Sequence, residues 1–327
     1  MQNSVIFLCA GQGSQYYNMT FELYKKNRVY HYYLTELNEI MYEITRYRVI
    51  DYLFDQSKNS FASCDDLILS SLALFSCQYA LGKLLINQGI TPDCVVGSSM
   101  GEFVALAISN EYYLKEIIKE IIRVTVTIKS NCQKGAMAVI LHRNSIFFDE
   151  REAFGDCVIA GINYNENFVV SGSNSSLENL SPYLKKNGIP FHRLPVNYAF
   201  HSELIKEIKE EIKNGFNPWK LEVPIGSCAY GRVIKKLPTS YIWDILRNPM
   251  LFQETIQNIE ENKNPIYVDL SPGGTLSNTL KHGRITNKKC YSIISRYNKE
   301  NELLEKLIND FNKEITKNME NNSLDSH

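Results

Sequence analysis

The sequence lacks an excess of charge of either sign. Its 327 residues carry 35 Lys and Arg against 36 Asp and Glu, which gives a formal net charge of -1. A nucleic-acid-binding protein needs a basic surface that displaces phosphate counterions, so the composition argues against nucleic acid as a partner. With 44% hydrophobic and 22% charged residues, the chain is expected to be an ordered globular protein. Its length predicts roughly two domains.

The sequence also lacks closely paired cysteines, paired histidines and long apolar runs. The eight cysteines form no Cys-x-x-Cys pair, and no two of the six histidines have metal-ligand spacing. We therefore expect neither a disulfide framework nor a metal site. Apolar runs such as residues 5–10 and 136–141 are far shorter than the ~20 residues that cross a bilayer. The N-terminus also lacks the basic start of a signal peptide. A cytoplasmic protein with reduced thiols and no membrane contact is expected.

Short apolar runs alternate with helical patterns, which is typical of an α/β protein. The expected strands of the larger part cover residues 5–9, 94–96, 223–228, 266–270 and 291–295, and the expected helices cover 21–54, 67–88, 102–109, 241–247, 252–261 and 302–315. Residues 130–198 instead follow the order β-α-β-β-α-β, which predicts an inserted ferredoxin-like subdomain. The expected division is a core of residues 1–129 and 199–327 and a small subdomain of residues 130–198.

The sharpest motif is Gly97-x-Ser99-x-Gly101, which lies between a predicted buried strand and a predicted helix. A serine on such a strained turn projects its hydroxyl outward, and the glycines permit the close backbone approach that the turn requires. The following helix directs N–H groups toward an oxyanion formed there. The alternative is a glycine-rich turn with a serine that only caps the helix.

Two further segments are candidates for the same site. Residues 11–15, GQGSQ, follow the first strand, but Tyr16 occupies the place of the third glycine of a dinucleotide-binding fingerprint. Such a loop beside the serine turn can donate backbone N–H groups to an oxyanion. His201 lies in an apolar and aromatic loop just after the small subdomain, where a base can reach a nucleophile. Taken alone, the loop can be only a turn and the histidine only a structural residue.

Seven segments, in this order, resemble the malonyl-CoA:acyl-carrier-protein transacylase family, which includes the acyltransferases that serve polyketide synthases. The segments are GQGSQ at 11–15, GSSMGE at 97–102, GAMAVI at 135–140, NYNENFVVSG at 163–172, YAFHS at 198–202, NP at 248–249 and LSPGGTL at 270–276. They run over almost the full length of the chain. The resemblance implies an α/β fold, with an α/β-hydrolase-like core that carries a ferredoxin-like subdomain, in agreement with the expected layout.

The resemblance also implies roles at matching positions. Ser99 would be the nucleophile and His201 its base, and the backbone N–H groups of Gln12 and Met100 would stabilise the tetrahedral oxyanion. The residues implied to surround the acyl group are Val124, Phe200, Leu251 and Asn163. The implied partner is an acyl carrier protein, the substrate is its acyl thioester, and no cofactor or metal is required.

Three positions depart from the family pattern. In malonyl transferases an arginine on the helix after the elbow clamps the malonate carboxylate, and an ungapped count from Ser99 places Val124 there. Arg123 is the neighbour, but one residue along a helix turns a side chain by about 100°. A buried malonate carboxylate without a cation would cost on the order of several kcal/mol. Ser98 replaces the usual histidine, and Leu251 stands where Gln or Arg is common.

The arginine-lacking branch of the family, which hydrolyses stalled acyl units from carrier proteins, therefore fits better. We predict an acyl hydrolase that acts through acyl-Ser99 and clears non-malonyl acyl groups in polyketide biosynthesis. The main alternative is a malonyl-CoA:acyl-carrier-protein transacylase in which a shifted helix lets Arg123 reach the substrate. A transferase of non-malonyl groups, a docking protein without turnover and a lipase-like hydrolase are further alternatives, and the lipase-like hydrolase would leave GQGSQ unexplained.

Carrier proteins of this kind are acidic, so a basic rim near the site is expected. Its candidates are Lys185, Lys186, Arg193, Lys281 and Arg284.

Overall fold

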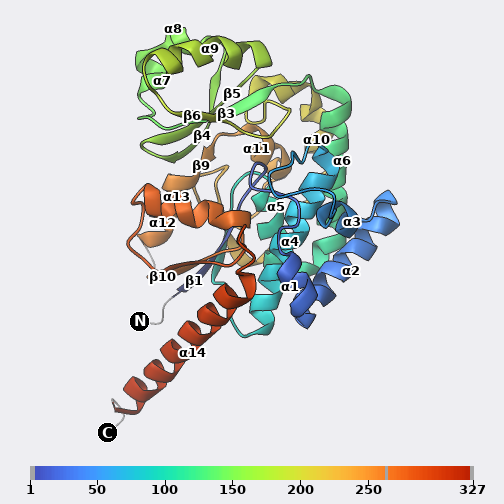
Figure 1. The fold of residues 1–327 in the computed structure, drawn as a ribbon, viewed down its shortest axis with the longest axis vertical. Helices are drawn as coiled ribbons and strands as arrows, with labels where there is room; N and C mark the ends of the chain where they lie inside the picture. The colour runs from blue at the N-terminus through green and yellow to red at the C-terminus, as the bar shows by residue number, and fades with distance from the viewer. Residues whose placement is uncertain (1–3, 262–263, 325–327) are drawn as a thin grey trace.

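Two β-sheets, one large and one small, organise the chain in the computed structural model, which describes residues 4–261 and 264–324 (Figure 1). The larger sheet has the strand order β11-β10-β1-β2-β7-β8. Its strands are β1 (Ser4–Cys9), β2 (Cys94–Gly97), β7 (Lys220–Ser227), β8 (Arg232–Lys236), β10 (Pro265–Asp269) and β11 (Cys290–Ser292). Neighbouring strands are parallel except β7 and β8. Because the carboxyl ends of β1 and β2 meet at one edge, the two loops that follow these strands lie together.

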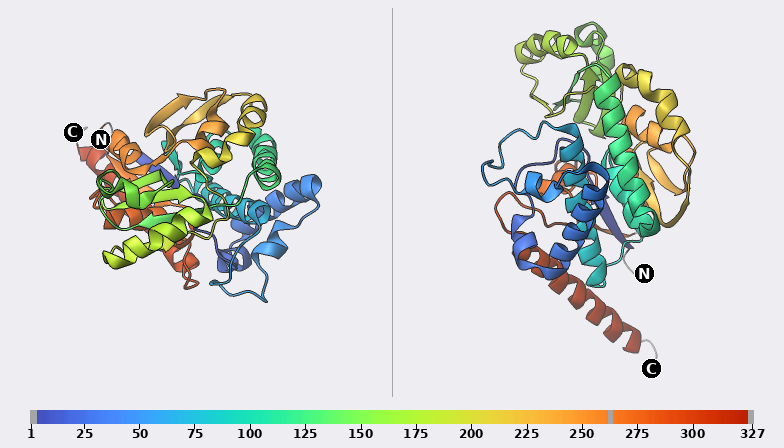
Figure 2. Two further views of the ribbon diagram at one scale, coloured as in Figure 1. Left: turned by 90° about the horizontal axis from the view of Figure 1, so that it is seen from above. Right: turned by 90° about the vertical axis from the view of Figure 1, so that its right-hand side faces the viewer.

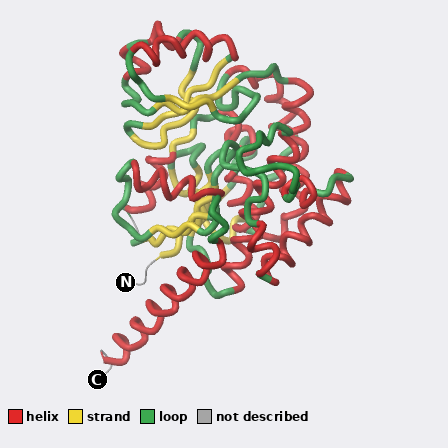
Figure 3. The backbone as a smooth tube through the Cα atoms, viewed as in Figure 1, coloured by secondary structure: helices red, strands yellow, loops and turns green. Residues whose placement is uncertain are grey.

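Helices cover both faces of the larger sheet, as expected for parallel strands. On one side are α4 (Leu67–Asn87), α5 (Gly101–Ser109) and α6 (Leu114–Asn131), and on the other are α12 (Phe252–Glu260) and α13 (Thr275–His282). Side chains of β1 alternate between the two, since Phe7 packs into the first core and Leu8 into the second. Figure 3 shows the strands between the two sets of helices.

The small sheet has the order β6-β3-β5-β4-β9. Its strands are β3 (Ala136–Ile140), β4 (Val158–Tyr164), β5 (Asn167–Gly172), β6 (Phe191–Arg193) and β9 (Met250–Leu251), and its helices are α7 (Ile146–Asp149), α8 (Arg151–Phe154) and α9 (Asn174–Lys186). The β-α-β-β-α-β order predicted for this region is present, with the first helix split in two. Figure 2 shows this unit at the top of its right-hand view. The fifth strand, β9, comes from outside residues 130–198 and pairs in parallel with β4.

The predicted helix over residues 21–54 is wrong as a single element. The structure has α1 (Phe21–Lys26), α2 (Arg28–Thr45) and α3 (Val49–Leu53) there. Asn27 breaks the first pair because its backbone is extended and its side chain accepts hydrogen bonds from the N–H groups of Val29 and Tyr30. Arg46, in the left-handed conformation, ends α2.

The remaining helical elements connect and flank these layers. They are η1 (Glu111–Tyr113), η2 (Glu203–Ile208), α10 (Lys209–Asn214), α11 (Tyr241–Arg247), η3 (Pro272–Gly274) and α14 (Glu300–Leu324), which projects from the body in Figure 1. The sequence did not predict β8, β9 or α13, because each is short or polar and is defined by its neighbours.

Helix α4 is apolar on almost every side. Among the described residues it is the one helix long and apolar enough to span a membrane by length and composition, but 78% of its most apolar window is buried inside the protein. It packs against α2, α5 and α6, and this central position accounts for its composition.

Candidate active site

Ser99 lies on a tight turn between β2 and α5, as predicted for the Gly97-x-Ser99-x-Gly101 motif. Its φ of +52° is the left-handed conformation that few non-glycine residues adopt. The flanking glycines are required by packing. A Cβ on Gly101 would lie 2.0 Å from the Cys9 carbonyl oxygen, and one on Gly97 would lie 2.4 Å from the Cα of Glu102. The turn is therefore pressed onto the ends of β1 and β2, and Ser99 stays partly exposed.

His201 meets Ser99 across this edge. The Nε2 atom of His201 lies 3.0 Å from the Ser99 Oγ, and Nδ1 lies 2.6 Å from the backbone carbonyl oxygen of Asn248. Because a carbonyl oxygen can only accept, the hydrogen must be on Nδ1, which leaves Nε2 as the acceptor for the serine proton. The His201 N–H also donates to the Leu246 carbonyl at 2.9 Å. The ring is thus held in the tautomer and orientation that a general base requires.

Burial sets the proton affinity of His201. The residue is 2% exposed, and this burial lowers its pKa to about 4, against the hydrogen bond to Asn248, which raises it. The charge of Arg247 lowers the pKa further. His201 is therefore neutral at pH 7, the state in which it can take a proton from Ser99.

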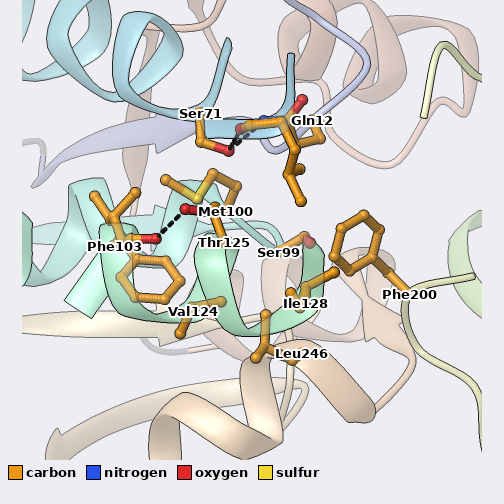
Figure 4. Close-up of a pocket in the computed structure, with 12 residues that line it drawn as sticks. Gln12, Ser71, Ser99, Met100, Phe103, Val124, Thr125, Ile128, Phe200 and Leu246 are labelled. Atoms are coloured by element: carbon orange, nitrogen blue, oxygen red, sulfur yellow. Dashed lines mark hydrogen bonds between the residues drawn. The ribbon is translucent and has the colours of Figure 1, made fainter. Parts of the chain in front are cut away.

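A narrow apolar cavity of about 30 Å³ lies on one side of Ser99. Figure 4 shows its side chains, which come from the GQGSQ loop and from α4, α5, α6, α11 and the loop before His201. The lining residues are Gln12, Leu67, Ser71, Ser99, Met100, Phe103, Ile121, Val124, Thr125, Ile128, Phe200 and Leu246. None of these residues is charged, so the cavity suits an uncharged and mainly apolar group.

A second cavity, of about 150 Å³, is lined by both Ser99 and His201. It is bounded by the small sheet, the GQGSQ loop and α13, and it is more polar than the first. Ser99, Gln12 and Phe200 line both cavities. Of the residues that line the second cavity, His201 alone is titratable. Ser99 therefore faces one small apolar cavity and one larger cavity that has more polar groups in its wall.

The structure brings most of the expected pocket residues together. Val124 and Phe200 line the apolar cavity and are 3% and 9% exposed, whereas Asn163 lines the second cavity. Leu251 lines neither, so its assignment to the pocket is wrong in this structure. It lies in β9, where successive side chains point to opposite faces, and its neighbour Met250 takes the cavity side.

Arg123 points away from both cavities. Its guanidinium pairs with the Glu120 carboxylate at 2.5 Å and donates to the backbone carbonyls of Glu211 (2.9 Å) and Ile212 (3.2 Å). It also packs against Gly215, where a Cβ would lie 2.6 Å from Cζ. The expectation that the Arg123 side chain points away from the cavity that Val124 lines is confirmed.

The two expected oxyanion donors lie beside the serine. Gln12 and Met100 both line the apolar cavity. Gly11 packs so closely on the turn that a Cβ would lie 2.9 Å from the Ser99 Cβ, which places the GQGSQ loop directly against the elbow. Among the hydrogen bonds of the described residues, neither the Gln12 nor the Met100 backbone N–H has an acceptor.

Several residues of the candidate site were not predicted from the sequence. Asn248, which holds Nδ1 of His201, belongs to the NP segment, but nothing in that dipeptide indicates that its carbonyl orients a histidine. The apolar walls Phe103, Ile121 and Leu246 carry only the signal of core residues. Of the basic residues expected at a rim, Lys281 lies in the last turn of α13, and Thr279 of the same helix lines the second cavity. The basic rim itself stays a prediction.

Comparisons with known proteins agree with this layout. The acyl transferase domain family matches residues 6–320. The polyketide biosynthesis acyltransferase homolog PksD of Bacillus subtilis is 32% identical over 305 residues, which is 92% of this chain and 94% of that protein. The homolog BaeD of Bacillus velezensis is 29% identical over 280 residues, 85% of this chain and 86% of its own.

Solved structures share the fold at low sequence identity. A loading acyltransferase from the avermectin modular polyketide synthase superposes with a TM-score of 0.86 at 19% identity, over 94% of this chain and all of that one. The malonyl CoA-acyl carrier protein transacylase from Clostridium perfringens gives 0.79 at 20% identity, over 96% and 98%. The predicted fold class, an α/β-hydrolase-like core with a ferredoxin-like subdomain, is confirmed.

Proposed function

Because the chain belongs to the acyl transferase domain family, we propose that it is a serine acyl hydrolase that removes uncharged acyl groups from acyl-carrier-protein thioesters in polyketide biosynthesis. The names of its curated relatives support the pathway and the group transferred. The carrier protein is proposed from the same relationship. The observation that carries the choice of acyl group is the apolar cavity beside Ser99, with Val124 in its wall and Arg123 turned away from it.

The first half-reaction follows from the hydrogen bonds of the pair. The Ser99 Oγ attacks the thioester carbonyl carbon while its proton passes to Nε2 of His201, 3.0 Å away. The carbonyl oxygen becomes an oxyanion, and the free N–H groups of Gln12 and Met100 are its proposed donors. Loss of one such donor typically raises the barrier by about 3 kcal/mol. The tetrahedral intermediate then expels the carrier thiol, which takes the proton from His201.

The second half-reaction releases the acid. A water molecule in the larger cavity loses a proton to Nε2 of His201 and attacks the acyl-Ser99 ester carbon. The ester C–O bond breaks, Ser99 recovers the proton, and the carboxylic acid leaves. The Asn248 carbonyl orients the imidazole through both steps but carries no charge, so it stabilises the imidazolium less than a carboxylate would.

The electrostatics of the apolar cavity argue against malonyl groups. None of the cavity-lining residues in the described part of the chain is a lysine or an arginine. An unpaired carboxylate in such a site costs about 3 kcal/mol or more, which corresponds to a disadvantage of at least ~100-fold. A malonyl-CoA:acyl-carrier-protein transacylase would need a cation here, and moving Arg123 would break its contacts with Glu120 and α10.

The test offers the purified protein separate carrier proteins loaded with acetyl, butyryl or malonyl groups and follows each release by mass spectrometry. We expect release of acetyl and butyryl groups, and slower release of malonyl groups by at least ~100-fold. Ser99→Ala should abolish release, and Arg123→Ala should leave it unchanged. Fast malonyl loading without release of the neutral groups would reject the hydrolase and favour the malonyl transacylase. Transfer of butyryl to a second carrier in place of release would favour a transferase.

A further inference from the structure

The carboxylate of Glu102 is buried directly beneath the catalytic turn and has no part in the mechanism above. It lies in the first turn of α5, three residues after Ser99, and is 0% exposed. Its backbone N–H donates to the Ser99 carbonyl at 2.9 Å. Its Cα and Cγ fill the space beside Gly97, where a Cβ would approach to 2.4 and 2.7 Å. Glu102 is thus fixed to both sides of the elbow.

Three donors from two other elements converge on this carboxylate. Oε2 accepts from the Ser227 hydroxyl at 2.7 Å and from the Tyr241 hydroxyl at 2.5 Å, and Oε1 accepts from the Ala229 N–H at 2.9 Å. No cation is among these donors. Burial raises the pKa of Glu102 to about 7, and the three hydrogen bonds oppose that rise. Burying a carboxyl group without a cationic partner costs free energy, which its hydrogen bonds offset only in part.

The same contacts continue to the histidine. The Ala229 carbonyl accepts from the Asn248 side-chain amide at 3.3 Å, and the Asn248 carbonyl accepts from Nδ1 of His201 at 2.6 Å. The preceding residue contributes as well, because the Cys228 carbonyl accepts from the Leu251 N–H at 2.8 Å. A continuous series of hydrogen bonds therefore runs from Ser99 through Glu102, Ala229 and Asn248 to His201. The 3.0 Å contact between His201 Nε2 and Ser99 Oγ completes the ring.

We propose that Glu102 is a positioning residue that fixes the distance between Ser99 and His201 through the Ala229 peptide and Asn248. This inference rests on the proposed Ser99–His201 chemistry. The serine and the histidine reside on different parts of the chain, 102 residues apart, and the Glu102 side chain links the elbow to Ala229, whose carbonyl contacts Asn248 beside the imidazole. A displacement of about 1 Å between two reacting groups can lower a rate by about 100-fold, so such a link has a kinetic consequence.

Protonation of Glu102 is compatible with this role. The titratable and charged groups that face it are Tyr241 and Asp244 on α11, and Cys228 and Tyr230 on the turn after β7. The Ala229 N–H donates to Oε1, and a proton on Oε2 can be shared with either hydroxyl, since hydroxyls both donate and accept. The link to Ala229 therefore holds in both ionisation states.

The test measures the reaction of Ser99 with a fluorophosphonate probe, which labels activated serines whatever acyl group the enzyme handles. The maximal labelling rate and the probe concentration at half of that rate are determined for each variant. Glu102→Ala should lower the maximal rate by about tenfold or more and leave the half-saturating concentration within about twofold. Glu102→Gln, which keeps an acceptor for Ala229, should stay within about threefold of the native rate.

A matched pair of tyrosines separates positioning from general stability. Tyr241 donates to Glu102, whereas Tyr230 donates to Asp244 at 2.6 Å in the same neighbourhood, with the two rings 5.8 Å apart. Tyr241→Phe should lower the maximal rate by about threefold or more, and Tyr230→Phe should leave it unchanged, at a similar loss of melting temperature. This pair decides the question even if Glu102→Ala fails to fold.

Two outcomes would overturn the inference. One is a folded Glu102→Ala variant that labels at the native rate, and the other is an equal effect of the two tyrosine substitutions. A native protein that is not labelled at Ser99, or that is labelled equally well as His201→Ala, would instead refute the proposed serine–histidine chemistry.

Discussion

Lowering the pH tests whether His201 is the base, because burial gives this residue an unusual proton affinity. The pKa of His201 is about 4, whereas an exposed imidazole has a pKa of about 6.5. At pH 5.5 an imidazole with the lower value is about 97% neutral, and one with the higher value is about 10% neutral. If neutral His201 takes the Ser99 proton, the reactivity of Ser99 should be nearly flat from pH 8 to pH 5.5 and should fall only toward pH 4.

The assay is the initial rate of fluorophosphonate labelling of Ser99, at limiting probe, measured from pH 4.5 to pH 8. Glu102→Gln serves as the control, because Glu102 also has a shifted pKa, about 7, and the glutamine cannot titrate. Both proteins should keep more than about 90% of their plateau rate at pH 5.5. A tenfold drop between pH 7.5 and 5.5 in both proteins would refute a buried, neutral His201. A tenfold drop of the labelling rate in the native protein alone would mean that the titration of Glu102 causes the pH dependence.

Further substitutions and a stability measurement extend these tests. Gly101→Ala should lower the free energy of unfolding by on the order of 3 kcal/mol or more, because the new Cβ would lie 2.0 Å from the Cys9 carbonyl oxygen. The control Gly89→Ala has a φ of +82° but open space around the new Cβ, and it should cost about 1 kcal/mol. Equal melting temperatures of the two variants would contradict the close packing at Gly101. Arg123→Ala should keep acyl release within about threefold and cost about 1 kcal/mol of stability, since its partly exposed ion pair is screened. Val124→Arg should raise the ratio of malonyl to butyryl loading by about tenfold or more, because it puts a cation into the apolar cavity, and an unchanged ratio would mean that this wall does not contact the acyl group. Burial of His201 should also reduce the free energy of unfolding at acid pH, because the folded protein protonates this residue only near pH 4 and the unfolded chain already near pH 6.5. Up to about 3 kcal/mol of stability should be lost as the pH falls through that window. Chemical denaturation at several pH values should show this loss in the native protein and not in His201→Gln.

The larger elements of the fold were predictable because their hydrophobic patterns are strong. Residues 94–96 and 266–268 are buried on both faces of the sheet and form continuous apolar runs. The break at Asn27 was missed because the same residue can end a helix or lie within one, and only its extended backbone decides. Strand β9 has two residues and exists only because β4 lies beside it, which no local pattern records.

The candidate site was predictable where its function depends on local backbone geometry. The glycines beside Ser99 predict a tight turn, and the order of strand, turn and helix predicts that this turn lies at the carboxyl end of a buried strand. The partner of His201 was not predictable, because a backbone carbonyl leaves no mark on the sequence. Leu251 was misplaced for a related reason: the resemblance gives a position along the chain, but the pleat of β9 decides which neighbour, Met250 or Leu251, faces the cavity.

The identity of the acyl group on Ser99 can be measured as the mass of the intact protein. The protein is mixed with equal amounts of butyryl- and malonyl-loaded carrier protein, and the reaction is quenched within one turnover. We expect a butyryl adduct on Ser99 that decays to free butyrate, and no malonyl adduct on the same residue. A malonyl adduct that accumulates on Ser99 while butyryl-carrier remains intact would contradict this expectation.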